Sequence, residues 1–304
     1  MTLALALNTI NVQTASAMDP NTPIASDGST IKSTEGASNL QGENGFSGTG
    51  ISTRNWRLES AEDFANLVAL PDPADNGTES IIGVDSRVLV NPTTTYPARA
   101  VVLVTFTGGR CTGWLYGKDI VATAGHCVHS GPGGTWKTNV RVYPGRNGIL
   151  SPYGVCTAKR LHSVTGWTVS GNEAYDYGAI KLNCTIGNTT GWFGFWWQSA
   201  SLTGLSTRTN GYPGDKPLTQ WRSLDFVRST GTSQIFYQND TVGGQSGSPV
   251  YQLRATGSAF CTGYCSMAIH AYGLHGSVPH STNNHGTRIN QSVFNNLVAW
   301  RNLP

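Results

Sequence analysis

From residue 81 onward, short apolar runs alternate with turn residues. Each run is four to six residues long, and the runs are Val101–Phe106, Cys111–Leu115, Ile120–Thr123, Tyr177–Leu182 and Ser248–Leu253. Gly-rich or Gly/Asp-containing turns separate the first three. This pattern predicts short antiparallel strands in an all-β domain. Because no helical pattern connects the strands, a parallel α/β sheet is not expected.

Two segments have helical patterns. Near the C-terminus, apolar residues recur at helical spacing from Val293 to Trp300 behind Ser292, which predicts a capped helix packed on the body. Near the N-terminus, Trp56–Phe64 predicts a short helix. Residues 71–77, which contain Pro and Gly, would end it.

The first 79 residues differ in composition from the rest. Residues 18–50 contain scarcely any large apolar side chains and cannot form a core of their own. Residues 1–79 hold ten acidic and three basic residues, a formal charge of −7, whereas residues 80–304 hold seven acidic and seventeen basic residues, a formal charge of +10. We therefore divide the chain into an acidic, largely irregular prosegment, residues 18–79, and a main domain, residues 80–304.

Residues 1–17 resemble the end of a secretory signal peptide. Leu3–Val12 is apolar, and Ala15-Ser16-Ala17 has the small residues of a cleavage site, although a basic region before them is missing. A frayed N-terminal tail is the alternative. No apolar run approaches the length of a membrane span, so we expect no membrane partner.

The cysteines also point to an extracellular protein. There are six, all after residue 110, and none forms a CxxC pair: Cys111, Cys127, Cys156, Cys184, Cys261 and Cys265. An even number in this arrangement predicts three disulfides and an oxidising compartment. A structural zinc site is the alternative, but the spacings do not form two ligand pairs.

The positive charge of the main domain would attract nucleic acid, a membrane surface or acidic polypeptide. No cluster of Lys and Arg and no alternation of basic and aromatic residues supports nucleic acid. We expect polypeptide partners, including the chain's own acidic prosegment, together with a monomeric state and no cofactor.

Two motifs suggest acyl-transfer chemistry. Ser246 lies in Gly243-Gly244-Gln245-Ser246-Gly247, and His126 lies in Thr123-Ala124-Gly125-His126-Cys127. A serine hydroxyl is a weak nucleophile that needs a neighbouring base, and flanking glycines let backbone N–H groups approach a developing oxyanion. Asp176 directly precedes a predicted strand and is the candidate that orients the histidine. Each residue alone has an ordinary interpretation, as a turn, a buried histidine or a cap; together they favour catalysis.

These motifs carry a resemblance to a known family. Thr123–Cys127, Asp176–Lys181 and Gly243–Pro249 resemble the chymotrypsin-like serine peptidases, specifically their bacterial glutamyl endopeptidase (V8-like) branch, as does Gly211–Lys216. The likeness covers residues 80–304. It implies a trypsin-like serine peptidase domain of two packed six-stranded antiparallel β-barrels, with the active site in the cleft between them.

The resemblance also implies roles for individual residues. Ser246 would be the nucleophile, His126 the general base and acid, and Asp176 its orienting partner, while the N–H groups of Gly244 and Ser246 would form the oxyanion hole. It implies a disulfide between Cys111 and Cys127. The short spacing of Cys261 and Cys265 suggests a local bridge, and Cys156 and Cys184 remain as the last pair.

Two features disagree about the substrate. Asp240 lies six residues before the nucleophile, where trypsin-like enzymes place the acid that binds Lys or Arg. Thr241 and His270 match the positions with which glutamyl endopeptidases hold a substrate carboxylate, and a hydroxyl and an imidazole both suit an anion. We prefer cleavage after Glu, with Asp weaker, and keep cleavage after Lys or Arg as the alternative.

The start of the main domain suggests proteolytic processing. Ser80–Arg87 resembles the mature start of glutamyl endopeptidases, and Glu79 precedes it. We expect removal of the prosegment between Glu79 and Ser80. Trypsin-like activation would need an acid directly before the nucleophile, where this chain has the uncharged Gln245.

Two other sequence features have both a functional and a structural interpretation. His270, His275, His280 and His285 recur every five residues, a spacing that keeps them on one face of neither strand nor helix, so no metal site is expected. The aromatic cluster Trp192–Trp197 could bind carbohydrate but is more typical of core packing. A catalytically inactive binding protein is the remaining alternative to an enzyme.

Overall fold

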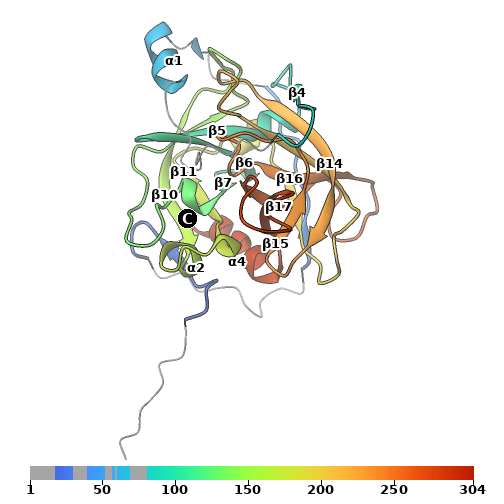
Figure 1. Cartoon of the computed structure of the whole chain (residues 1–304). Helices are drawn as coiled ribbons and strands as arrows, with labels where there is room; N and C mark the ends of the chain where they lie inside the picture. The colour runs from blue at the N-terminus through green and yellow to red at the C-terminus, as the bar shows by residue number, and fades with distance from the viewer. Residues whose placement is uncertain (1–17, 30–39, 52–56, 59, 69–80) are drawn as a thin grey trace, which may run out of the picture.

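The computed structural model describes residues 18–29, 40–51, 57–58, 60–68 and 81–304, and most of the last range forms two β-barrels (Figure 1). The first closes in the order β10-β11-β7-β6-β5-β8, with β8 pairing back to β10. Its strands are β5 Val101–Phe106, β6 Gly109–Gly117, β7 Ile120–Thr123, β8 Arg141–Pro144, β10 Cys156–Val164 and β11 Gly178–Leu182.

The second barrel closes in the order β16-β13-β14-β15-β18-β17, with β17 pairing back to β16. Its strands are β13 Ser206–Gly211, β14 Trp221–Thr230, β15 Gln234–Tyr237, β16 Pro249–Arg254, β17 Gly263–Tyr272 and β18 Asn284–Arg288. All pairings within both barrels are antiparallel. The prediction of two six-stranded barrels is confirmed, and the five predicted strands agree with β5, β6, β7, β11 and β16 to within two residues at each end.

Shorter elements complete the fold. Short strands on or beside the barrels are β4 Val88–Leu89, β9 Leu150–Ser151 and β12 Gly194–Trp196. Single helical turns are η1 Ala98–Ala100, η2 Gly125–Cys127, α2 Thr165–Thr168, η3 Glu173–Tyr175 and α3 Gly187–Thr190. No helix in the described part of the chain is long and apolar enough to cross a membrane.

The core explains why short apolar runs suffice. All six residues of β5 are buried, because one face of the strand fills the barrel and the other is covered. The aromatic cluster belongs to this interior: Phe193 packs edge-on against Trp114 and Tyr251, and the Phe195 ring lies 5.0 Å from that of Phe294. These contacts favour a packing role for the cluster over a carbohydrate site.

The C-terminal helix α4 runs from Gln291 to Asn302. Its N-cap is Asn290, whose side-chain oxygen accepts a hydrogen bond from the Val293 N–H at 3.0 Å. The predicted cap, Ser292, was therefore wrong, because Ser292 already lies inside the helix. Trp300 is fully buried and stacks on His162 of β10 at 5.6 Å between ring centroids, which docks the helix on the first barrel.

The described parts of the acidic leader, residues 18–79, are more ordered than their composition predicts. β1, Pro23–Ala25, adds to the edge of the first barrel at β10, and β2, Gly42–Glu43, pairs with β12. In the described parts of the leader, Asp27 forms an ion pair with Arg160 at 2.7 Å and Glu43 forms one with Arg301 at 2.9 Å. The acidic leader is thus held by strand pairing and by the basic domain.

Two further leader elements are short. β3, Arg57–Leu58, pairs with β9, and the helix α1 runs from Ala61 to Val68 at the periphery of the molecule (Figure 1). The predicted helix at residues 56–64 was therefore placed too early. The predicted break at residues 71–77 lies outside the described residues.

We expect His162→Phe to reduce the acid sensitivity of the fold. Burial, together with the Arg160 guanidinium, lowers the pKa of His162 to about 3, against about 6.5 in an unfolded chain. Between these values only the unfolded state takes up the proton, so the free energy of unfolding falls as the pH drops from about 6.5 toward 3, by about 1.4 kcal/mol per pH unit. Phenylalanine keeps the stacking on Trp300 and does not titrate.

The measurement is urea unfolding at pH 6.5 and pH 5 in an inactive Ser246→Ala background. The loss of stability between these two pH values should be smaller in His162→Phe by about 2 kcal/mol. Equal losses in the two proteins would show that His162 does not titrate as its burial requires.

Candidate active site

His126 lies just after the end of β7. The strand finishes at Thr123, and the turn η2, Gly125–Cys127, places the histidine at the mouth of the first barrel. The Cys111–Cys127 disulfide ties this turn to β6, with the two Cα atoms 6.1 Å apart. The histidine backbone is therefore fixed from both sides.

Asp176 lies between η3 and β11, and its side chain is fully buried. One carboxylate oxygen, Oδ2, is 2.7 Å from Nδ1 of His126, and the other, Oδ1, accepts the backbone N–H of His126 at 2.8 Å. The Thr287 hydroxyl donates to the Asp176 carbonyl at 3.1 Å. This two-point contact fixes the orientation of the imidazole and keeps a proton on its Nδ1.

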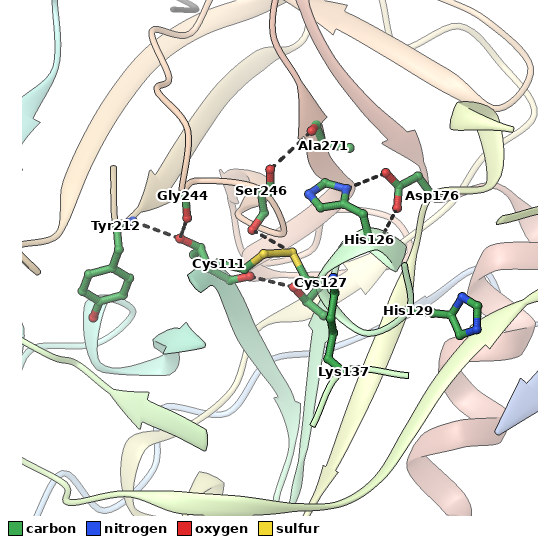
Figure 2. The surroundings of a disulfide bond; sticks show 12 residues. Cys111, His126, Cys127, His129, Lys137, Asp176, Tyr212, Gly244, Ser246 and Ala271 are labelled. Atoms are coloured by element: carbon green, nitrogen blue, oxygen red, sulfur yellow. Dashed lines mark hydrogen bonds and ion pairs between the residues drawn. A yellow bond between two sulfur atoms is a disulfide. The ribbon is translucent and has the colours of Figure 1, made fainter. Parts of the chain in front are cut away.

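Ser246 sits in the turn that precedes β16. The Thr112 N–H donates to its carbonyl at 2.9 Å, and its own hydroxyl is 3.4 Å from the Ala271 carbonyl, a long hydrogen bond. Figure 2 shows that the ring nitrogen of His126 that is not bonded to Asp176 faces the Ser246 side chain. The three residues come from both barrels and meet between them.

The glycines around Ser246 have backbone conformations that a side chain would not tolerate. Gly244 has φ +92° and Gly247 has φ +89°, both in the left-handed region. A Cβ on Gly247 would lie 2.1 Å from the Thr112 carbonyl oxygen. The serine therefore projects from a turn that only glycine at these two positions allows.

The same turn presents unused backbone donors. The N–H groups of Gln245, Gly247 and Ser248 are all hydrogen-bonded within the protein, whereas those of Gly244 and Ser246 donate to no acceptor in the described parts of the chain. The Thr112 hydroxyl donates a hydrogen bond to the Gly244 carbonyl at 2.8 Å, which fixes the Gly244–Gln245 peptide between the two donor residues. Two free donors beside a serine hydroxyl are the arrangement that stabilises an oxyanion.

Thr241 and His270 are both buried beside this turn. The His270 carbonyl accepts the Gly247 N–H at 2.7 Å, and its Nδ1 lies 2.7 Å from the Tyr237 hydroxyl. Burial and the neighbouring His285 and His126 lower the pKa of His270 to about 3, so its imidazole is neutral at ordinary pH. The Thr241 hydroxyl is buried and has no hydrogen-bond partner within the described ranges.

The Asp240 carboxylate is hydrogen-bonded to the start of the main domain. It accepts the N–H of Ile82 at 2.8 Å, the N–H of Ser86 at 2.7 Å and the Ser86 hydroxyl at 2.6 Å. The residue is 2% exposed. Because these three donors already satisfy the carboxylate, the structure argues against its use for a substrate Lys or Arg.

Arg87 attaches the start of the main domain to the body at a second point, in addition to Asp240. The buried Arg87 guanidinium forms ion pairs with Asp85 at 2.8 Å and with Asp215 at 2.7 Å, and Asp215 lies in the Gly211–Lys216 segment. The Gln245 side chain instead accepts the Val242 N–H at 3.0 Å. The start of the main domain is thus fastened at Asp240 and Arg87, and not at the residue before Ser246.

Several neighbours of the site were not predicted. The Tyr272 ring lies 5.9 Å from that of His126, and burial together with the Asp176 carboxylate raises the pKa of Tyr272. The Tyr237 hydroxyl is hydrogen-bonded to Nδ1 of His270, and the Thr287 hydroxyl donates a hydrogen bond to the Asp176 carbonyl. All three lie on barrel strands, where their sequence pattern does not differ from that of core residues.

The remaining predicted positions divide into two groups. The structure pairs Cys111 with Cys127, Cys156 with Cys184 and Cys261 with Cys265. Glu79 and Ser80, the expected processing site, lie outside the described residues.

Comparison with known proteins shows the family to which the chain belongs. A model of the trypsin family matches residues 88–271. The chain is 40% identical over 295 residues to a glutamyl endopeptidase of Bacillus licheniformis, a match that covers 94% of this chain and 90% of the relative. It is 36% identical to a Bacillus subtilis protein named an extracellular metalloprotease, over 99% of this chain and 94% of that protein.

The fold leads to the same group. A solved structure of a Glu endopeptidase in complex with MPD superposes with a TM-score of 0.66 at 27% identity, covering 73% of this chain and all of the other. The chain therefore belongs to the trypsin family of chymotrypsin-fold serine peptidases, and it is a serine endopeptidase homologous to the bacterial glutamyl endopeptidases.

Proposed function

We propose that this chain is a secreted endopeptidase that cleaves peptide bonds after Glu, and more weakly after Asp, through an acyl-enzyme at Ser246. The proposed specificity rests on a difference between two adjacent residues. The Asp240 carboxylate is hydrogen-bonded to Ile82 and Ser86, whereas the buried Thr241 hydroxyl has no hydrogen-bond partner in the described structure. Secretion is supported by the three disulfides, which persist in oxidising compartments.

The acylation step follows from the hydrogen bonds. Asp176 holds the proton on Nδ1 of His126, so Nε2 is the basic nitrogen that accepts the Ser246 proton as Oγ attacks the scissile carbonyl. The carbonyl oxygen becomes an oxyanion, to which the N–H groups of Gly244 and Ser246 donate. His126 then returns the proton to the leaving amine, and the ester of Ser246 remains.

Deacylation repeats the sequence with water. His126 takes a proton from the water, hydroxide adds to the ester carbon, and the same two N–H groups hold the second oxyanion. Collapse of this intermediate breaks the bond to Ser246 Oγ, which regains its proton from His126. The new carboxyl terminus leaves.

We expect Thr241 and His270 to recognise the substrate carboxylate by donating hydrogen bonds, since neither side chain carries a positive charge. The neutral His270 is anchored through Nδ1 by Tyr237; where that hydroxyl donates, the proton lies on Nε2, which is then a donor for the substrate carboxylate. The Thr241 hydroxyl supplies a second donor. A buried hydroxyl left unpaired costs free energy, and a bound Glu side chain would satisfy it.

We expect Thr241→Val to lose activity toward Glu selectively. Valine keeps the shape of threonine but cannot donate, and a hydrogen bond to a charged group contributes about 1.5–3 kcal/mol, so kcat/KM for a Glu peptide should fall by roughly 10- to 100-fold. A matched Phe peptide should be cleaved at a nearly unchanged rate. Thr241→Ser, which keeps the hydroxyl, is the control and should retain the Glu preference; equal losses on both peptides would assign Thr241 a packing role only.

We also propose that residues 18–79 are a prosegment that is removed between Glu79 and Ser80. Cleavage there would place a new N-terminus two residues before Ile82, whose N–H is bound by Asp240 beside Thr241. A chain that cleaves after Glu would be able to make this cut itself. The strand pairing of β1 and β2 with the body supports a leader that stays docked until it is removed.

A further inference from the structure

A second cluster of ionisable side chains lies beside the active site, on the other side of Tyr272. It consists of Glu173 on η3, His275 and His280 in the loop between β17 and β18, and His285 on β18. Donor atoms of Glu173, His280 and His285 all lie within 4.8 Å of one another. His275 Nε2 lies 3.1 Å from Oε2 of Glu173, so a third imidazole reaches the same carboxylate.

The four side chains converge although their spacing in sequence does not require it. Ring centroids of His280 and His285 are 4.7 Å apart, and those of His275 and His285 are 5.0 Å apart. The five-residue spacing keeps histidines off one face of a regular element, but the loop between β17 and β18 folds back on itself. His275 N–H donates to the His280 carbonyl at 3.2 Å, which holds this fold.

His285 is the member that most needs an additional partner. It is fully buried, and neither ring nitrogen has a hydrogen-bond partner within the described residues. Its Nε2 is 3.7 Å from Oε2 of Glu173, which is too long for a hydrogen bond. Tyr272 and Phe236 stack on the ring, at 5.3 and 5.4 Å between centroids, so the imidazole is held rigidly with its edge toward the cluster.

We propose that Glu173, His280 and His285, with His275 as the fourth ligand, form a binding site for a divalent transition-metal ion of the Zn²⁺ type. Imidazole nitrogen and carboxylate oxygen are the ligands that such ions prefer, and three or four of them complete a tetrahedral site. Two ligand atoms of one tetrahedral ion are separated by roughly 3.3 Å, given bonds of about 2.0 Å. The spacings of 3.1 and 3.7 Å around Oε2 of Glu173 fit this arrangement.

The site has a way in for the ion. The side chains of Glu173 and His275 are each 38% exposed, whereas His285 is buried behind them. An ion from solvent would meet the carboxylate and the outer imidazole first and would satisfy the inner one on binding. The cluster is distinct from the proposed catalytic residues, and within the described part of the chain none of its members is hydrogen-bonded to Ser246.

Occupancy would join the two barrels next to the catalytic aspartate. Glu173 belongs to η3, three residues before Asp176, whereas the histidines belong to the β17–β18 region of the second barrel. A bound ion would cross-link η3 to that loop. Its expected effect is thermal stabilisation, because an ion that binds only the folded chain shifts the unfolding equilibrium.

The test uses the full chain with Ser246→Ala, to prevent self-digestion, and Zn²⁺ or Co²⁺ alone as the probe. Equilibrium dialysis should show one saturable Zn²⁺ site, and Co²⁺ should give the visible absorption of a tetrahedral ion. Glu173→Gln and His280→Gln, both at partly exposed positions, should each weaken Zn²⁺ binding by at least about 10-fold and abolish the rise in Tm on adding Zn²⁺.

Two control variants locate the site. His129→Gln changes a histidine outside the cluster, and His126→Ala removes the catalytic imidazole, so both should bind Zn²⁺ as the parent does. Circular dichroism without metal shows whether each variant is folded. Absence of saturable binding, binding that survives both cluster substitutions, or loss of binding in His126→Ala would overturn the proposal.

Discussion

Ser246→Ala should lower kcat by about 10⁶-fold while leaving the fold intact, because in the proposed mechanism the Ser246 hydroxyl is the group that becomes acylated. The side chain makes one long hydrogen bond, to the Ala271 carbonyl at 3.4 Å, so its removal costs little packing. The measurement is peptide hydrolysis under saturating substrate, with the melting temperature recorded in parallel. The variant should melt within a few degrees of the parent.

Ser248→Ala is the matched control, since it makes the same chemical change two residues away. The Ser248 hydroxyl is buried and has no hydrogen-bond partner in the described structure, so this variant should keep near-normal kcat. Equal losses in the two variants would mean that the turn, and not the Ser246 hydroxyl, had been damaged.

The N-terminus of Ser246→Ala also reports on processing: a terminus at Ser80 in the inactive protein would exclude self-cleavage as the only route.

Asp176→Asn should lower kcat by about 10⁴-fold at neutral pH. The carboxylate accepts two hydrogen bonds from His126, one from Nδ1 at 2.7 Å and one from the backbone N–H at 2.8 Å. An asparagine offers one oxygen and one NH₂ group, so it cannot accept both. Where the NH₂ group meets Nδ1, the proton moves to Nε2 and His126 no longer acts as a base toward Ser246.

The control for this variant is Asp119→Asn, which removes a carboxylate from an ion pair with Lys181 at 3.1 Å in the same barrel. It should lower the stability of the fold, because the buried Lys181 ammonium loses its carboxylate partner, and it should leave kcat unchanged. Substrate affinity should change little in Asp176→Asn, because the side chain is buried behind the histidine. A loss confined to KM would contradict the orienting role.

The barrel strands could be predicted because burial on both faces leaves a signal in the sequence. β5 and β7 consist almost wholly of apolar residues, and their turns contain glycine, so local composition and tertiary position agree. The short strands of the leader could not be found in this way. Residues Gly42–Glu43 form a strand only because β12 offers an unpaired edge, which is a property of the folded body.

The residues of the candidate active site also divide into those that the sequence predicts and those that it does not. His126 and Ser246 stand in recognisable motifs, so their types and order were visible, and Asp176 followed from its place before a strand. The hydrogen bonds of the Asp240 carboxylate could not be predicted from the sequence, because its partners Ile82 and Ser86 lie more than 150 residues away along the chain. The convergence of His280 and His285 depends on a loop that folds back, and no periodicity encodes it.

The most direct test of the account is the selectivity of the mature protein on four peptides that differ only in the residue before the scissile bond: Glu, Gln, Lys or Phe. The two proposed donors, Thr241 and His270, predict that kcat/KM is highest for Glu and exceeds that for Gln by at least about 10-fold, although the two side chains have nearly the same shape. The highest kcat/KM for the Lys peptide would contradict the account, because it would require Asp240 to face the substrate.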